Sequence, residues 1–229
     1  MLYAFIDEQT GFEETPRFLA ASCVAVLQSR YNKKVQEVKM LLHQSKEPSF
    51  LEQLDEMLSS LDGLAVIGTA RLDPQVLRFG EKDGTFDIPK MARTDNAWAD
   101  IVLLTVAETL KRLVKRHVAF SKVDMYLDQK DLKPKLWVEM KRTLRIKLPK
   151  IYRQWWDANR VLFSRDISVR HIKRVVKSRS LEAEDKFQLG TRLADAVVSE
   201  AKRHRTGLGR IKYRDLSTLL TEYLQRYDE

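Results

Sequence analysis

An apolar run that ends in two carboxylates opens the chain and restricts its fold more than any other feature. Leu2–Ile6 is apolar, Asp7 and Glu8 follow directly, and Gly11 indicates a turn. A second apolar run, Phe18–Leu27, is rich in small and β-branched residues, so the two runs predict an antiparallel hairpin. Burying a carboxylate without a partner is costly, so we expect a cation beside Asp7, and a divalent metal is the first candidate.

Further periodicities predict an α/β fold in a single domain that spans residues 1–229. Strand patterns occur at 64–72, at 123–127 and within 161–169, which makes a central mixed sheet of about five strands. Helices that flank the sheet are expected at 32–44, from 49 to 61, from 94 or 95 to 117, at 133–158, at 181–205 with Ser180 as its cap, and at 213–227. Residues 73–93 are expected to form an irregular loop.

Charge divides the chain into an acidic half, 1–132, and a basic half, 133–229. The first half contains 17 Lys and Arg against 20 Asp and Glu, a net charge of −3. The second contains 24 against 12, a net charge of +12. This asymmetry indicates a polyanionic partner, nucleic acid before membrane, although a merely soluble basic surface is the simpler alternative.

Cysteine content and hydropathy favour a cytoplasmic protein. Cys23 is the only cysteine, so no disulfide framework or cysteine-based zinc site can form within one chain, and we expect a buried, inert thiol. A reducing compartment fits this usage best. No apolar run reaches the length of about 18 residues that a membrane-spanning helix needs. Asp7 and Glu8 also interrupt the region where a signal peptide would be apolar.

Two later acids can meet Asp7 in the folded chain. Asp128 directly follows the apolar run at 123–127, and Asp195 shares a predicted helix face with Gln188 and Arg192. If that helix lies across the strand ends, the three carboxylates converge and require a cation. Oxygen-only ligation favours Mg²⁺ or Mn²⁺, and two such ions can activate a water and stabilise the leaving oxygen of a phosphodiester. The alternative for each acid is a simple ion pair or hydrogen bonds from backbone amides.

These motifs resemble those of a known family. The chain carries Asp7-Glu8 after its first strand, Tyr126-Leu127-Asp128 at the end of its fourth, and Gln188 with Leu193-Ala194-Asp195 on a late helix. This pattern resembles the domain of unknown function 3800 family, which is similar to the RNase H-like (retroviral-integrase-type) superfamily. The resemblance spans Asp7 to Asp195. Gln9-Thr10-Gly11 stands where that family has Ser-Gly, and Gln188 lies further from Asp195 than in the family motif.

The resemblance implies a three-layer RNase H-like fold with metal-dependent nuclease activity. Asp7, Asp128 and Asp195 would then be catalytic metal ligands, and Asp131 is an alternative to Asp128. Glu8 would be a supporting catalytic carboxylate, although neighbours on a strand point to opposite faces. A fourth ligand often comes from the helix between the third and fourth strands. There Asp100 is preferred to Asp95 and Glu108, with a solvated helical charge as the alternative for each.

The basic half supplies candidates for nucleic-acid binding through backbone or shape recognition. Those we expect to contact phosphate are Arg145, Arg153, Arg170, Lys173, Arg174, Arg192 and Arg203. Trp155 and Trp156 could stack on bases, but core packing is the more common role. Sequence leaves the choice between DNA and RNA open, as it does the oligomeric state, with a homodimer among the options.

Two other functions compete with the metal-dependent nuclease. The first is an inactive nucleic-acid-binding or assembly module with the same fold. The second is a helical ribonuclease that needs no metal, because Arg112 and His117 have the Arg-x4-His spacing of such enzymes. That spacing arises easily by chance in a basic chain.

Overall fold

One six-stranded mixed sheet forms the centre of the computed structural model, which describes residues 1–11, 17–72, 88–128, 134–159, 164–178, 180–204 and 208–225. Its strands are β1 (Leu2–Gly11), β2 (Arg17–Leu27), β3 (Leu64–Leu72), β4 (Lys122–Asp128), β5 (Ser168–Val175) and β6 (Ile211–Asp215). They lie in the order β5-β4-β1-β2-β3-β6. β2 is antiparallel to β1 and β3, and all other neighbours are parallel. The α/β class is confirmed, and the sheet includes strands from both the acidic and the basic half.

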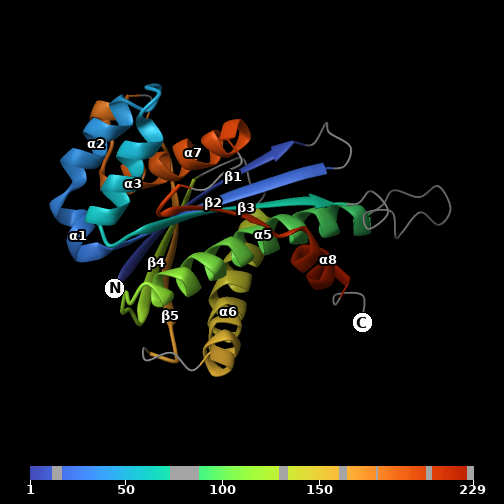
Figure 1. The fold of residues 1–229 in the computed structure, drawn as a ribbon. Coiled ribbons are helices and arrows are strands. Elements are labelled where there is room, and N and C mark those ends of the chain that lie inside the picture. The colour runs from blue at the N-terminus through green and yellow to red at the C-terminus, as the bar shows by residue number, and fades with distance from the viewer. Residues whose placement is uncertain are drawn as a thin grey trace.

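Helices cover both faces of this sheet, which gives three layers (Figure 1). One face carries α1 (Gln28–Lys33), α2 (Val35–His43), α3 (Phe50–Ser60) and α7 (Lys186–His204). The other carries α5 (Ile88–Lys115), α6 (Pro134–Asn159) and α8 (Ser217–Gln225). None of the helices in the described part of the chain combines the length and apolar character that a membrane crossing requires.

Side-chain alternation in β1 divides the core into two clusters. Tyr3 and Phe5 pack with residues of α1, α2, α3 and α7, whereas Ala4 and Ile6 pack with residues of α5 and α6. This is the period of two that a pleated strand imposes. Because the pattern continues to Asp7, that carboxylate lies on the α7 face of the sheet.

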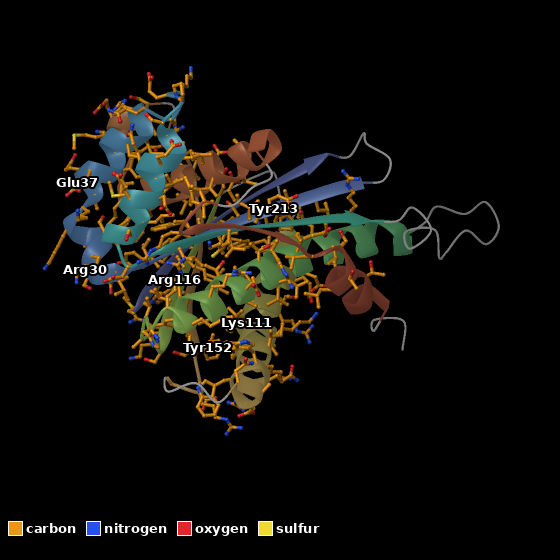
Figure 2. The ribbon with its side chains drawn as sticks, in the orientation of Figure 1. Arg30, Glu37, Lys111, Arg116, Tyr152 and Tyr213 are labelled. Carbon is orange, nitrogen blue, oxygen red and sulfur yellow. The ribbon has the colours of Figure 1, made fainter. Side chains whose placement is uncertain are left out.

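The last third of the chain differs most from the sequence prediction. The fifth strand is Ser168–Val175 rather than a segment within 161–169. Residues 211–215, most of them expected to be helical or to lead into the helix, form β6, which pairs with β3 and receives a 2.8 Å hydrogen bond from Thr69 Oγ1 to Tyr213 Oη (Figure 2). Long-range pairing with β3 therefore overrides the local helical spacing.

Several helix boundaries also differ. Residues 32–44 belong to two helices, α1 and α2, and Ser180 caps a 3₁₀ turn at Leu181–Ala183 rather than the long helix. α5 begins at Ile88, inside the expected loop, of which residues 73–87 lie outside the described ones. Cys23 is fully buried in β2, and burial raises the pKa of its thiol to about 12, as expected of an inert cysteine.

Candidate carboxylate site

Three carboxylates from three separate elements meet around one lysine ammonium group. Lys177 Nζ lies 2.9 Å from Asp128 Oδ2, 3.1 Å from Asp195 Oδ2 and 3.5 Å from Asp7 Oδ2. Asp7 is in β1, Asp128 is the last residue of β4, and Asp195 is in α7. The structure thus brings together the three acids that the sequence analysis singled out, and adds a cation that it did not. We call these four residues the carboxylate site.

Sheet topology explains why the strand residues meet. β4 lies between β1 and β5 and is parallel to both, so the carboxyl ends of the three strands lie at the same edge of the sheet. Ile6 pairs with Leu127, and Asp7 and Asp128 are the residues that follow this pair. Lys177 comes two residues after Val175, the last residue of β5. Ligand and catalytic sites are common at this position in open α/β sheets.

A glycine lets α7 approach the sheet closely enough to bring Asp195 to this edge. A Cβ atom on Gly190 would lie only 2.2 Å from Cε1 of the Phe5 ring in β1. Nearby, Ser22 Oγ of β2 donates a 2.7 Å hydrogen bond to the carbonyl oxygen of Ala194. The residue before Asp195 is therefore fixed directly to the sheet.

The start of α7 is fixed as well. Asp185 Oδ1 accepts hydrogen bonds from the backbone amides of Phe187 and Gln188, at 2.8 and 2.9 Å. Gln188 Oε1 in turn accepts from the Asp185 amide at 2.7 Å, which completes a reciprocal capping arrangement. Tyr31 Oη of α1 donates to the carbonyl oxygen of Lys186 at 2.6 Å. The first turn of α7 is thus held before the helix reaches the carboxylates.

Side chains of α7, together with Glu184 just before it, hold the segment that contains Lys177. Gln188 Nε2 donates to the carbonyl oxygen of Val176 at 2.5 Å, and Arg192 Nη2 donates to that of Ser178 at 2.6 Å. Glu184 Oε1 accepts from the Ser178 amide at 3.0 Å and from Arg192 Nε at 2.6 Å. The backbone on either side of Lys177 is therefore fixed to one face of α7. We call these contacts the clasp.

Burial makes the charges of the carboxylate site strongly interdependent. The side chain of Asp7 is 1% exposed, those of Asp128 and Lys177 are 12% and 17% exposed, and that of Asp195 is 42% exposed. Burial of Lys177 disfavours its charged form, but the nearby carboxylates outweigh this effect and raise the pKa of the ammonium above its ordinary value. Lys177 is consequently a cation at neutral pH, beside three carboxylates.

The donor set of the carboxylate site suits a hard divalent cation. All its acidic ligands are carboxylate oxygens, which Mg²⁺ and Mn²⁺ prefer. The separations of 2.9–3.5 Å are those of an ammonium group, whereas Mg²⁺–oxygen distances are about 2.1 Å. Accordingly, the described residues include no group of three or more acids, histidines or cysteines already spaced to hold a metal ion. A metal ion bound by these three carboxylates would take the place of the Lys177 ammonium group.

Of the two supporting acids, Asp100 is the one whose side chain the structure describes. Asp100 lies in α5, on the opposite face of the sheet, where it is 1% exposed and its Oδ1 is 3.5 Å from Lys147 Nζ of α6. Its packing in the interface between α5 and α6 separates it from the carboxylate site. Glu8 is in β1 and pairs with Ala21 of β2, but its side chain lies outside the described residues, as does Asp131.

The predicted phosphate-binding residues whose side chains the structure describes are distributed over α6, β5 and α7. Arg145 is exposed on α6, and Arg153 on the same helix pairs with Asp166 at 2.6 Å. Arg192 belongs to the clasp, so its guanidinium is committed to Glu184 and Ser178 rather than open to phosphate. The side chain of Arg203 lies outside the described residues.

Of the basic residues of β5, Lys173 and Arg174 lie toward the end of the strand that reaches the carboxylate site, whereas Arg170 lies toward its start. Arg170 Nε is 3.6 Å from Asp124 Oδ1, and the Arg174 guanidinium stacks 4.5 Å from the ring centre of Trp137. Lys173 is exposed and lines a hollow of about 250 Å³. Trp155 and Trp156 are half-buried and pack against the core, the more common role expected for them.

That hollow lies next to the clasp. Its lining includes Val176 and Gln188, which are joined by a clasp hydrogen bond. The rings of Tyr126 and Phe187 also line it, stacked with centroids 4.3 Å apart. The hollow thus combines aromatic surface with the ammonium group of Lys173, a few residues from Lys177.

The Arg-x4-His pattern does not form a shared helix face. α5 ends at Lys115, and His117 has a left-handed backbone with φ of 61°. Arg112 Nε pairs with Glu108 Oε1 at 2.7 Å, and the neighbouring Arg116 donates to the Gly209 carbonyl at 3.1 Å (Figure 2). The helix that the ribonuclease pattern requires therefore stops before its histidine.

Sequence reasoning missed the role of Lys177, which it grouped with the other basic residues of the second half. The cause is the misplaced fifth strand. With a strand at 168–175 parallel to β4, a residue two positions beyond its end reaches the edge that also holds Asp7 and Asp128. The available signal was the β-branched residues Val169, Ile172 and Val175, which extend beyond the segment 161–169 that the prediction used.

Comparison with known proteins gives no family assignment for this chain. The chain matches no protein-family model, and no curated protein matches it significantly in sequence.

Proposed function

We propose that this protein is a divalent-metal-dependent nuclease that hydrolyses phosphodiester bonds of DNA or RNA. The observation that carries the proposal is the convergence of Asp7, Asp128 and Asp195 on one cationic centre. These residues come from β1, β4 and α7, so the fold itself assembles the site. Three carboxylates at such short range are costly unless a cation compensates them, which makes their convergence a specific feature.

In this proposal the three aspartates hold Mg²⁺ or Mn²⁺. When bound, such an ion activates a water and stabilises the charge of the leaving oxygen. Asp7 and Asp128 are fixed by the strands that carry them, and Asp195 by the contact of Gly190 with Phe5 and of Ala194 with Ser22. Rigid positioning of ligands is what a catalytic metal site requires. Glu8 would support the site as a neighbouring carboxylate.

Substrate would approach through the hollow beside the clasp. The partly exposed ring of Phe187 can contact a base, and Lys173 can contact a phosphate, without reading base sequence. We propose the RNase H-like superfamily and the domain of unknown function 3800 family as the relationship that best explains this arrangement. The mixed sheet in three layers, with acids on the first strand, the fourth strand and a late helix, supports it. The cytoplasm remains the proposed compartment.

A cleavage assay tests the proposal. Labelled single-stranded, double-stranded and branched DNA and RNA are incubated with the protein in Mg²⁺, Mn²⁺ or EDTA. We expect cleavage with either metal and none in EDTA. Asp195→Asn should abolish cleavage without unfolding the protein, because this side chain is 42% exposed. Asp166→Asn, an exposed aspartate paired with Arg153, is the matched control and should leave cleavage unchanged.

The second candidate function is an inactive nucleic-acid-binding module. The ammonium group of Lys177 at the centre of the three carboxylates favours it, because the site already contains a cation. Such a module would bind nucleic acid with the steep salt dependence of phosphate contacts, but would neither cleave it nor respond to metal. Binding without cleavage under all metal conditions would therefore replace the nuclease proposal with this one.

A further inference from the structure

We propose that Lys177 is a built-in competitor of the divalent cation, which holds the three carboxylates together without metal and is displaced when metal binds. This inference rests on the proposed metal site. Its basis is the position of Lys177 Nζ, within 3.5 Å of a carboxylate oxygen of Asp7, Asp128 and Asp195 alike. The ammonium group occupies the point on which these side chains converge, so a metal ion there would take its place.

The clasp holds the backbone of Lys177 beside the three carboxylates. Val176 and Ser178 flank Lys177, and α7 holds the carbonyl oxygen of each through Gln188 and Arg192. The backbone of Lys177 is therefore fixed at the sheet edge, within permanent reach of the carboxylates. An attached cation of this kind acts at a high effective concentration, unlike a free ion from solution.

The choice of lysine allows release as well as occupancy. Lysine carries a compact point charge on a flexible four-carbon stem, whereas arginine would hold a carboxylate in a planar bidentate pair. The side chain can swing out while the clasp keeps the backbone in place. Lys177 is already 17% exposed, and Asp195 on its open side is 42% exposed, so the route out faces solvent.

Electrostatics makes the two cations mutually exclusive. Two positive charges a few ångströms apart in a half-buried site repel strongly. Metal binding must therefore break three ammonium–carboxylate contacts, and this cost lowers the apparent affinity for metal. The four groups carry a formal charge of −2, and exchange of the ammonium for a divalent ion brings the site to −1. A divalent ion can consequently win the exchange at sufficient concentration.

Removal of the Lys177 charge should have two opposite effects. Without metal, three carboxylates remain close together and the protein becomes less stable. With metal, no ammonium has to be displaced, so binding becomes tighter. The gain in melting temperature on addition of metal should therefore be larger in the variant than in the wild type.

Titration calorimetry with Mn²⁺ as the probe tests the inference on the full chain. We compare wild type, Lys177→Met and Lys150→Met, which removes a lysine charge from an exposed position of α6 and serves as the control. We expect Lys177→Met to bind Mn²⁺ at least about tenfold more tightly than wild type, and Lys150→Met to bind as wild type does. Equal or weaker binding by Lys177→Met, with binding by wild type, would overturn the inference and leave the metal site standing. Absence of binding in all three would overturn both.

A second variant protects the test against misfolding. Lys177→Gln keeps a hydrogen-bond donor near the carboxylates but removes the charge. Its melting temperature is measured in EDTA and in Mn²⁺ beside that of wild type. A larger Mn²⁺-induced rise in the variant supports the inference, and an equal or smaller rise contradicts it.

Discussion

Among the described residues, Lys147 and Lys177 each contact a buried aspartate, and a comparison of the two contacts distinguishes a structural ion pair from a candidate functional site. Lys147 of α6 faces Asp100 of α5 at 3.5 Å, in a contact that joins two helices on one face of the sheet. Lys177 faces Asp7, Asp128 and Asp195 on the other face, at the carboxyl ends of parallel strands. The first contact joins the ammonium group of Lys147 to the carboxylate of Asp100. The second joins the ammonium group of Lys177 to the carboxylates of Asp7, Asp128 and Asp195.

The environment of Asp100 also differs from that of the carboxylate site. Asp100 is enclosed by core residues, and its Oδ2 has no hydrogen-bond partner among the described residues. Burial raises the pKa of its carboxyl, and the charge of Lys147 only partly offsets this effect. The carboxylate site instead opens towards solvent at Asp195 and adjoins a hollow. A buried acid in a helix interface serves packing, whereas a cluster with excess negative charge and an opening can exchange ions with solvent.

Exchange of single aspartates should separate the two regions most clearly. Asp128→Asn removes a proposed metal ligand, and we expect the rate of metal-dependent cleavage to fall at least about 100-fold. This loss exceeds the usual effect of mutating a residue that only contacts a metal ligand. Asp100→Asn should keep cleavage within a few-fold of wild type. Cleavage rates at saturating Mn²⁺, with circular dichroism to verify folding, provide the measurement. Comparable losses in both variants would erase the distinction.

Gly190→Ala tests whether close approach of α7 creates the carboxylate site. Alanine normally favours a helix over glycine, but here its Cβ would meet the Phe5 ring at 2.2 Å. We expect net destabilisation of about 1–3 kcal/mol, the usual cost of overpacking a core. Urea unfolding measures it, with Ser59→Ala at an exposed position of α3 as the control. Unchanged or higher stability would show that α7 does not depend on this contact.

The pH dependence of the free energy of unfolding should report the raised pKa of Asp100. Because burial raises its pKa, the folded protein retains this proton at pH values where the unfolded chain has already lost it. The free energy of unfolding should therefore fall as pH rises from about 4 through the raised pKa, by at most about 1.4 kcal/mol per pH unit. Asp100→Asn should remove this decline in urea-unfolding curves collected across that range. A profile identical to wild type would contradict the assigned shift.

The smallest effect concerns nucleic-acid binding. Lys173→Ala should weaken binding a few-fold for all sequences and reduce the slope of log affinity against log salt by about 1, as loss of one phosphate contact does. Arg145→Ala, exposed on α6 and on the other side of the sheet, should have less effect if substrate lies beside the carboxylate site. Fluorescence anisotropy at several salt concentrations compares them. A larger effect of Arg145→Ala would move the binding surface to α6.

Sequence predicted the elements whose pattern is local and strong. The hairpin of β1 and β2, the strands β3 and β4, and the long helix before β4 follow from apolar runs and helical spacing. Asp7, Asp128 and Asp195 could be identified because each follows or lies within such an element. Their convergence required only that α7 lie across the strand ends, which Gly190 and Ser22 make possible.

Long-range pairing determined what local patterns could not predict. β6 exists because it pairs with β3, although its residues were expected to be helical or to lead into a helix. The position of β5 depends on its register with β4, and with it the position of Lys177. Asp100 and Arg192 have helical spacing that suits a site, but their partners, Lys147 and Glu184, become evident only in the folded protein.

Anomalous diffraction from crystals soaked in MnCl₂ tests the central claim most directly. The account predicts a manganese peak bound by Asp7, Asp128 and Asp195, with the Lys177 side chain turned out of the site and the clasp unchanged. Lys177 still in contact with all three carboxylates at high Mn²⁺, without a peak among them, would contradict it.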